Sequence, residues 1–87
     1  NKQANPSMPP RQVIVYTRPG CHLCDDACEV LQRYGLEPEL INIDTDAQLV
    51  AAYGYSIPVV VFDGKERFRG HIDERLLERL LIAGDSH

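Results

Sequence analysis

The most reactive pattern in the chain is a pair of cysteines separated by two residues, Cys21-His22-Leu23-Cys24. In a helix, this spacing puts the second sulfur about one turn beyond the first, close enough for the pair to form a disulfide. Such a pair can exchange with another disulfide through a mixed disulfide. Because Cys21 follows Pro19-Gly20 in a predicted loop, we expect Cys21 to be the exposed nucleophile and Cys24 the resolving thiol.

The cysteine pair lies where a predicted helix begins, and this position favours ionisation. A helix N-terminus carries unpaired N–H groups and a partial positive charge. Cysteine thiols at such positions ionise at pH values of roughly 3.5–7.5, against about 8.5 for a free thiol. His22 is a further candidate, because its imidazole can donate a hydrogen bond to the Cys21 thiolate. Asp25 and Asp26 suit the helix dipole but oppose ionisation of nearby thiols.

Two other uses of the cysteines are open. A zinc site needs four ligands, and a single cysteine pair supplemented by Cys28, His22 and His71 is an incomplete set, so we expect no bound metal. Cys28 shares a helix face with Cys24 and is either a third redox thiol, a cluster ligand or a small buried side chain. The buried side chain is the interpretation we favour.

Ile57-Pro58 is the second candidate feature, directly before an apolar run. A proline is tolerated at the first position of a strand, which is the plain interpretation. Alternatively, a cis bond here exposes the backbone of Ile57 beside the cysteines, where it can pair with an extended substrate chain.

Local patterns predict the elements that position these residues. In the first half, β-branched residues predict a buried strand over Val13–Tyr16, and apolar residues recur at helical spacing from Leu23 to Tyr34. Gly35 then suits a helix C-terminus, and Glu39–Ile43 alternates as a strand does. A short helix ends at Tyr53, with Asp44 and Thr45 as its predicted N-caps.

In the second half, Val59–Phe62 reads as a buried strand and Asp63-Gly64 as a two-residue hairpin turn. Lys65–Arg69 follows as an edge strand. Asp73 caps a last helix, which ends near Gly84 and has one apolar face, made of Leu76, Leu77, Leu80 and Leu81.

The predicted order is therefore β-α-β-α-β-β-α, an α/β fold in which three helices cover a four-stranded mixed sheet. The first β-α-β unit must be parallel, whereas the hairpin makes the last two strands antiparallel. We expect one domain over residues 12–84, a disordered arm over 1–11 and a tail over 85–87.

Composition excludes several function classes for a chain of 87 residues. The net charge of −4 argues against nucleic-acid binding, and the longest apolar run, Val59–Phe62, is too short to cross a membrane. Three cysteines within eight residues do not form the spread framework of a secreted disulfide-rich domain, and the polar arm lacks the apolar core of a signal peptide. We expect a cytoplasmic monomer.

These segments resemble the glutaredoxins. Residues 16–24, YTRPGCHLC, look like the glutaredoxin active-site segment. Residues 56–64 resemble that family's Thr-Val-Pro strand and turn, and Phe68-Arg69-Gly70 with Asp73 is similar to its glycine-rich bend. The similarity extends from about Val13 to Leu81, and the CHLC motif is most similar to small glutaredoxin-like proteins.

The resemblance implies a thioredoxin-like fold with a cis bond before Pro58. It also implies that Cys21 attacks and Cys24 resolves, and that Arg18 binds the glycine carboxylate of glutathione. Ile57 would hydrogen-bond the cysteine of glutathione through its backbone, and Gly70 would form the bend beside it. This chain differs from the family pattern at three places. Arg69 stands where the family has the first of two adjacent glycines, and His71 and Ile72 stand where it has polar residues after the bend. His22-Leu23 replaces the Pro-Tyr of common glutaredoxins.

We therefore expect a dithiol oxidoreductase that reduces disulfides of proteins or glutathione mixed disulfides. It would bind no cofactor, with glutathione as a candidate co-substrate. Its electron donor would be glutathione or a reductase of the thioredoxin-reductase type. Two alternatives stay open. One is an iron–sulfur or metal carrier, which must borrow ligands or dimerise to reach four cysteines. The other is a non-catalytic binding module with the same fold.

Overall fold

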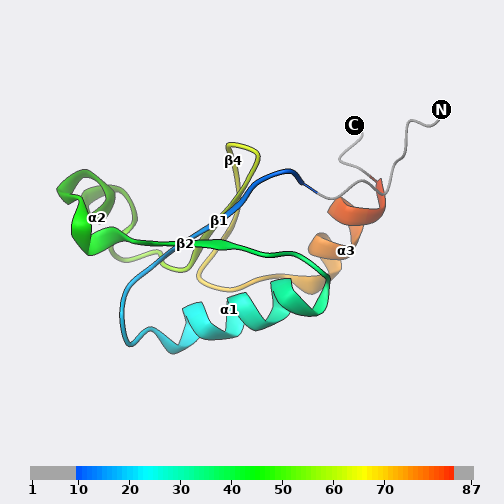
Figure 1. The fold of residues 1–87 in the computed structure, drawn as a ribbon, viewed down its shortest axis with the longest axis horizontal. Helices are drawn as coiled ribbons and strands as arrows, with labels where there is room; N and C mark the ends of the chain where they lie inside the picture. Colours follow the sequence, from blue (N-terminus) through cyan, green and yellow to red (C-terminus); the bar gives the residue numbers. More distant parts are fainter. Residues whose placement is uncertain (1–9, 84–87) are drawn as a thin grey trace.

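The computed structural model describes residues 10–83, and they form one four-stranded sheet packed with helices (Figure 1). In chain order the elements are β1 (Val13–Thr17), α1 (His22–Arg33), β2 (Glu39–Asn42), the 3₁₀ helix η1 (Ile43–Thr45), α2 (Ala47–Tyr53), β3 (Val59–Phe62), β4 (Lys65–Arg69) and α3 (Glu74–Ala83). The predicted β-α-β-α-β-β-α order is confirmed. Apart from residues 10 and 11, the predicted arm lies outside the described residues, as does the predicted tail.

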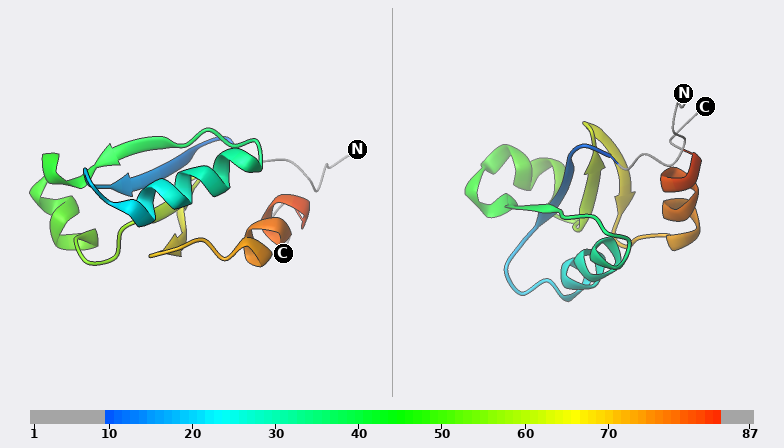
Figure 2. Two further views of the ribbon diagram at one scale, coloured as in Figure 1. Left: turned by 90° about the horizontal axis from the view of Figure 1, so that it is seen from below. Right: turned by 45° about the vertical axis from the view of Figure 1, so that its right-hand side comes forward.

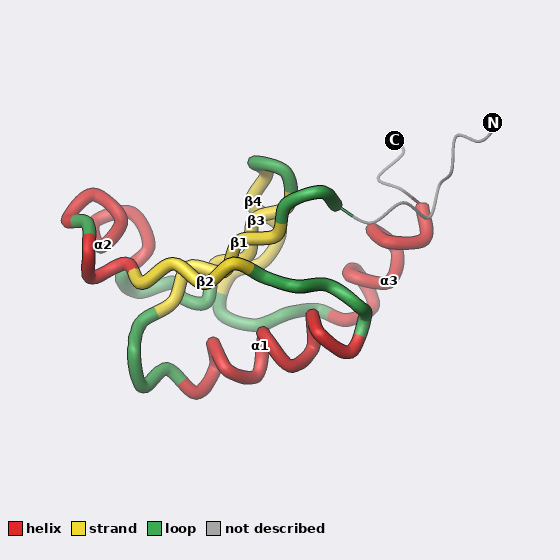
Figure 3. Tube along the Cα trace, viewed as in Figure 1, coloured by secondary structure: helices red, strands yellow, loops and turns green. Residues whose placement is uncertain are grey.

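The strands lie in the order β2-β1-β3-β4 (Figure 3). β1 and β2 are parallel, with Tyr16 opposite Ile41, because α1 carries the chain back along the sheet between them. β1 pairs antiparallel with β3, with Tyr16 opposite Val59, and β3 pairs antiparallel with β4. The sheet is therefore mixed and β4 is an edge strand, as predicted.

The main core lies between one face of the sheet and the two longer helices. α1 contributes Leu31 and α3 contributes Leu77, and both side chains are fully buried. They belong to one apolar cluster, and its members from the sheet are Val13, Val15, Val60, Phe62 and Phe68. Figure 2 shows α1 running along the sheet with α3 at one end. The predicted apolar face of the last helix is confirmed, since its leucines pack on this cluster.

The short helix α2 contacts the opposite face. Tyr16 of β1 points away from the main core, because its neighbour Val15 points into it. The ring of Tyr16 stacks on the ring of Tyr53 in α2, with 4.7 Å between the ring centroids. Figure 1 shows α2 and α3 at opposite ends of the molecule, and the chain turns from β1 into α1 at the end where α2 lies.

Two connections have the backbone that their sequences predict. Gly35 has φ +83° directly after α1, which lets the Leu36 N–H reach back to the Leu31 carbonyl at 3.0 Å. In the hairpin between β3 and β4, Asp63 and Gly64 have φ values of 50° and 85°. Two successive positive φ values are what a two-residue turn needs to match the twist of its strands.

The helix caps after β2 differ from those predicted. Asp44 and Thr45 are not N-caps of α2. Residues 43–45 instead form η1, which is capped by Asn42, and the Asn42 side chain accepts the N–H of Asp44 at 2.9 Å. Asp46 caps α2 by accepting the N–H of Gln48 at 2.8 Å. At α3, the predicted cap is confirmed, because Asp73 accepts the N–H of Arg75 at 3.0 Å.

Candidate active site

Cys21 is the N-cap residue of α1, immediately before the first helical residue. Its extended backbone, with φ −86° and ψ 105°, turns its side chain back over the first turn. There Sγ of Cys21 accepts the N–H of Cys24 at 3.2 Å. An N–H at the positive end of a helix stabilises negative charge on the atom that accepts it. The predicted position of the cysteine pair at a helix start is confirmed.

The two cysteines form a disulfide, with 5.2 Å between their Cα atoms, but their surroundings differ. Cys21 is half-buried, whereas only 2% of Cys24 is exposed. In the dithiol form, burial and the hydrogen bond with Cys21 raise the pKa of Cys24 to about 11, against the opposing effects of Thr17 and Arg18. Cys24 is therefore protonated at neutral pH when the disulfide is reduced.

Cys28 is a free thiol one turn after Cys24 on α1. It is partly buried and packs against the main core cluster. Burial, together with the charge of Asp25, raises its pKa. This packing agrees with the interpretation of Cys28 as a small core side chain.

His22 is the first residue of α1 and is exposed. Among residues 10–83, it forms no hydrogen bond with Cys21, whose sulfur is contacted by the N–H of Cys24 instead. Asp25 and Asp26 are also exposed on the same turn. The structure therefore places His22 beside the motif but not on the sulfur.

Ile57 and Pro58 lie at the edge of the sheet where β1 enters the loop that carries Cys21. The register places Val59 opposite Tyr16, so Pro58 comes opposite the end of β1. The bond between Ile57 and Pro58 is cis, as the sequence resemblance implied, and Pro58 is fully buried. Within residues 10–83, neither the N–H nor the C=O of Ile57 forms a hydrogen bond.

Gly70 holds the residues on both sides of Ile57. Its N–H lies 3.1 Å from the carbonyl oxygen of Ser56 and 2.9 Å from that of Pro58. Gly70 follows β4 with φ +83°, a backbone conformation that glycine adopts without strain. The structure therefore brings two predicted site residues, Gly70 and Pro58, into direct contact.

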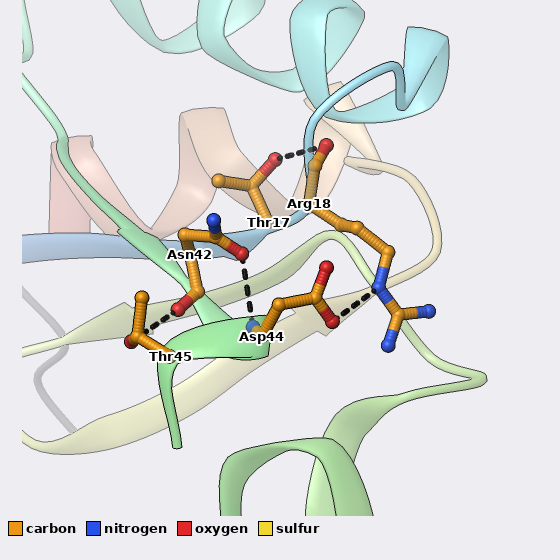
Figure 4. A network of polar contacts seen from close by, with 5 residues as sticks. All are labelled: Thr17, Arg18, Asn42, Asp44 and Thr45. Atoms are coloured by element: carbon orange, nitrogen blue, oxygen red, sulfur yellow. Dashed lines mark hydrogen bonds and ion pairs between the residues drawn. The ribbon is translucent and has the colours of Figure 1, made fainter. Parts of the chain in front are cut away.

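Arg18 already has a carboxylate partner, which the sequence analysis missed. Its Nε donates to Oδ1 of Asp44 at 2.9 Å, and Figure 4 shows the two side chains facing each other. Asp44 is held in η1, where its own N–H and the hydroxyl of Thr45 both bond to Asn42. A substrate carboxylate at Arg18 has to share the guanidinium with Asp44 or displace it.

The parallel pairing of β1 and β2 explains this contact. Thr17 lies opposite Asn42, so the residues that follow the two strands emerge at the same edge of the sheet. Arg18 comes one residue after β1 and Asp44 two residues after β2. The ion pair could therefore have been predicted from the sequence, because opposite charges follow two strands that are expected to be parallel neighbours.

Arg69 is a second residue that the sequence analysis did not include in the site. Its Nη1 donates to Oγ of Ser56 at 2.8 Å, directly before Ile57. The same guanidinium pairs with Glu66 and lies 5.8 Å from the ring centroid of Tyr53. No local pattern marks Arg69, because Ser56 and Tyr53 are distant from it in sequence.

Residues 10–83 contain no group of three or more histidine, cysteine, aspartate or glutamate side chains placed to hold a metal ion. In the same range, no helix has the length and apolar character needed to cross a membrane.

Comparison with known proteins agrees with this architecture. The family model of the glutaredoxin-like domain (DUF836) matches residues 12–82. An uncharacterized protein of Mycobacterium tuberculosis is 32% identical, over 76% of this chain and 77% of that protein.

Two solved structures show the same fold. The X-ray structure of protein XcR50 from X. campestris is 35% identical, with a TM-score of 0.67, and covers 86% of this chain and 97% of that one. A glutaredoxin from Archaeoglobus fulgidus is 28% identical, with a TM-score of 0.58, and covers 79% of this chain and 85% of that one. The predicted thioredoxin-like fold is confirmed.

Proposed function

The chain belongs to the glutaredoxin-like domain family, and we propose on this basis that it is a thiol–disulfide oxidoreductase using Cys21 and Cys24. The observation that carries the proposal is the asymmetry of the pair. Sγ of Cys21 accepts an N–H at the start of α1, whereas Cys24 is buried and its pKa is raised to about 11. One sulfur is thus suited to attack and the other to remain a thiol until a mixed disulfide has formed.

The proposed reaction has two exchange steps. The Cys21 thiolate attacks one sulfur of a substrate disulfide, forms a Cys21–substrate bond and expels the other substrate sulfur as a thiolate, which takes up a proton. Cys24 then loses its proton and attacks Sγ of Cys21, which releases the second substrate sulfur as a thiol. Two electrons pass from the pair to the substrate, and the pair ends as the disulfide that the structure contains.

The substrate chain would dock at Ile57. In the described part of the chain, the N–H and C=O of Ile57 have no partner, and this residue is half-buried at the edge that carries Cys21. A free N–H and C=O on one residue can pair with an extended segment as a neighbouring strand does. Such pairing would hold the substrate disulfide over Cys21 without depending on substrate side chains.

The substrates of this reaction would be disulfides of other proteins or mixed disulfides of glutathione. The thiols themselves carry the electrons, so the exchange needs no bound cofactor. Glutathione or a thioredoxin-reductase-type flavoenzyme would then reduce the Cys21–Cys24 disulfide. We place this activity in the cytoplasm, where the thiol pool keeps such pairs reduced.

Reduction of insulin and of a glutathione mixed disulfide by the pre-reduced protein tests the proposal. We expect both Cys21 and Cys24 to become oxidised as substrate thiols appear in equal number. Cys28→Ala is the matched control and should retain the reaction, because Cys28 packs against the core. No oxidation of the pair by either substrate would contradict the proposal. Visible absorption after anaerobic treatment with iron and sulfide would then support a cluster carrier instead.

A further inference from the structure

We propose that Arg69 is a positioning residue for substrate docking, because it holds Ser56 and thereby keeps the backbone of Ile57 in place. The inference rests on the proposed function, in which Ile57 receives the substrate chain. It concerns a residue that neither carries out the exchange nor contacts the cysteines.

The docking residue Ile57 lies in a connection between α2 and β3 that has no regular hydrogen-bond ladder. Main-chain bonds from Gly70 hold the carbonyls of Ser56 and Pro58, on either side of Ile57. The side chain of Ser56 supplies another attachment, since its Oγ accepts from Nη1 of Arg69 at 2.8 Å. Arg69 and Gly70 therefore hold this connection through a side chain and through the main chain.

The Arg69 guanidinium is itself fixed from two further directions. Nη2 donates to Oε1 of Glu66 at 3.1 Å, and Nε pairs with the other carboxylate oxygen of the same residue. The group also lies over the Tyr53 ring, 5.8 Å from its centroid. A planar guanidinium can satisfy these partners together, whereas a lysine ammonium provides no such fork.

Through Tyr53, Arg69 is also connected to β1, the strand that precedes the cysteine pair. Tyr53 stacks on Tyr16 of β1, and β1 ends one residue later. The loop after β1 carries Cys21. Arg69 thus lies between the segment that would bind the substrate chain and the strand that sets the position of the attacking sulfur.

A contribution to stability is a poor explanation for this arrangement. The Arg69 side chain is 49% exposed, and exposed ion pairs contribute about 0–1 kcal/mol to folding. The contacts instead restrict where Ser56 can lie. Loss of these contacts should leave the protein folded but increase the mobility of the Ile57 backbone. Substrate docking should then weaken, whereas the reactivity of Cys21 should not change.

The first test follows single turnovers of pre-reduced protein with two substrates, a peptide disulfide that can pair with Ile57 and bis(2-hydroxyethyl) disulfide, which is too short to pair. For Arg69→Ala and Ser56→Ala, we expect the half-saturating peptide concentration to rise about three- to tenfold, which corresponds to the net contribution of one ordinary hydrogen bond. The limiting rate with peptide and the rate with the small disulfide should stay unchanged. Arg69→Lys should recover part of the loss.

The control is Lys65→Ala, which removes a cation from the same strand, where Lys65 is exposed. It should match the unaltered protein with both substrates. Equal losses with the peptide and the small disulfide would show a general structural defect and overturn the proposal, as would an unchanged half-saturating concentration for the peptide.

The second test does not depend on activity. Hydrogen exchange of the Gly70 amide, measured by NMR, should become about three- to tenfold faster in Arg69→Ala, because Ser56 is freer to move away from it. The amide of Val15 in the central strand should exchange as before. Unchanged exchange at Gly70 would overturn the inference. Failure of the unaltered protein to react with either disulfide would instead overturn the proposed function.

Discussion

The amide nitrogen of Cys24 lies 3.2 Å from Sγ of Cys21, so the second cysteine of the pair donates a hydrogen bond to the first. The contact follows from the spacing, because an N-cap side chain accepts the N–H of the residue three positions later. Two intervening residues thus place the amide of Cys24, the proposed resolving cysteine, where it can stabilise negative charge on Sγ of Cys21. The side chain of Cys24 points into the interior, and only 2% of this residue is exposed to solvent.

This asymmetry predicts different outcomes for the two serine variants. Cys21→Ser should abolish exchange, because no thiolate remains at the helix start. Cys24→Ser should accumulate a mixed disulfide between Cys21 and the substrate, because nothing resolves it. Mass spectrometry of the non-reduced protein measures the adduct. An adduct that forms on Cys24 in Cys21→Ser, with none on Cys21 in the other variant, would reverse the assigned roles.

The resolving step should accelerate with pH. Burial is the largest cause of the raised pKa of Cys24, about 11, and it persists when Cys21 carries a substrate. Only a small fraction of Cys24 is then thiolate at pH 7, and this fraction grows about tenfold for each pH unit up to the pKa. Rapid alkylation quenching between pH 7 and 10 measures the decay of the mixed disulfide. A rate that is flat over this range would contradict the assignment.

The ion pair between Arg18 and Asp44 predicts that Asp44 limits the binding of anionic substrates. Asp44→Asn removes a competing charge and should raise kcat/KM for a glutathione mixed disulfide about two- to fivefold, the range for an exposed pair. Asp46→Asn is the matched control. This substitution removes a nearby negative charge that does not contact Arg18. Because asparagine is also a good N-cap residue, α2 should keep its cap. Equal effects of both variants would show that only overall charge matters.

Tyr34 should ionise at a higher pH than an ordinary tyrosine side chain. Its hydroxyl donates to Glu78 at 2.8 Å and to Glu74 at 3.2 Å, and these bonds, together with partial burial, raise its pKa to about 12. The contribution of the protonated phenol to stability is present below pH 10 and is lost as the pH rises through 12. Phenolate absorbance should show a late phase that is missing in Tyr34→Phe.

A core substitution in α3 should destabilise the fold far more than a surface one. Leu77 is fully buried against the sheet, and Leu77→Ala should lower the free energy of unfolding by about 2–5 kcal/mol. Ile82 lies in the same helix but is 68% exposed, so Ile82→Ala should change it by about 0.5 kcal/mol or less. Urea unfolding measures both. A similar loss in the two variants would contradict the assigned packing of α3.

Much of the architecture could be predicted because its signals are local. The run Val59–Phe62 followed by Asp63-Gly64 marks a buried strand and a tight turn within six residues. The helix after Cys21 shows its apolar period within three turns. The predicted N-cap of α2 was wrong, because four residues before this helix are all good caps, and the sequence alone does not show which of them is used. They are Asn42, Asp44, Thr45 and Asp46. Because β2 ends at Asn42 in the structure, Asn42 caps η1 and Asp46 caps α2.

The sequence by itself determined the order of the elements and the position of the cysteine pair at a helix start, since both depend on residues a few positions apart. Only the tertiary structure decided that Arg18 pairs with Asp44 and that Arg69 holds Ser56, because these partners are 26 and 13 residues apart. Contacts of that kind depend on which strands become neighbours and on their register. Both result from packing the whole core, so no single segment contains them.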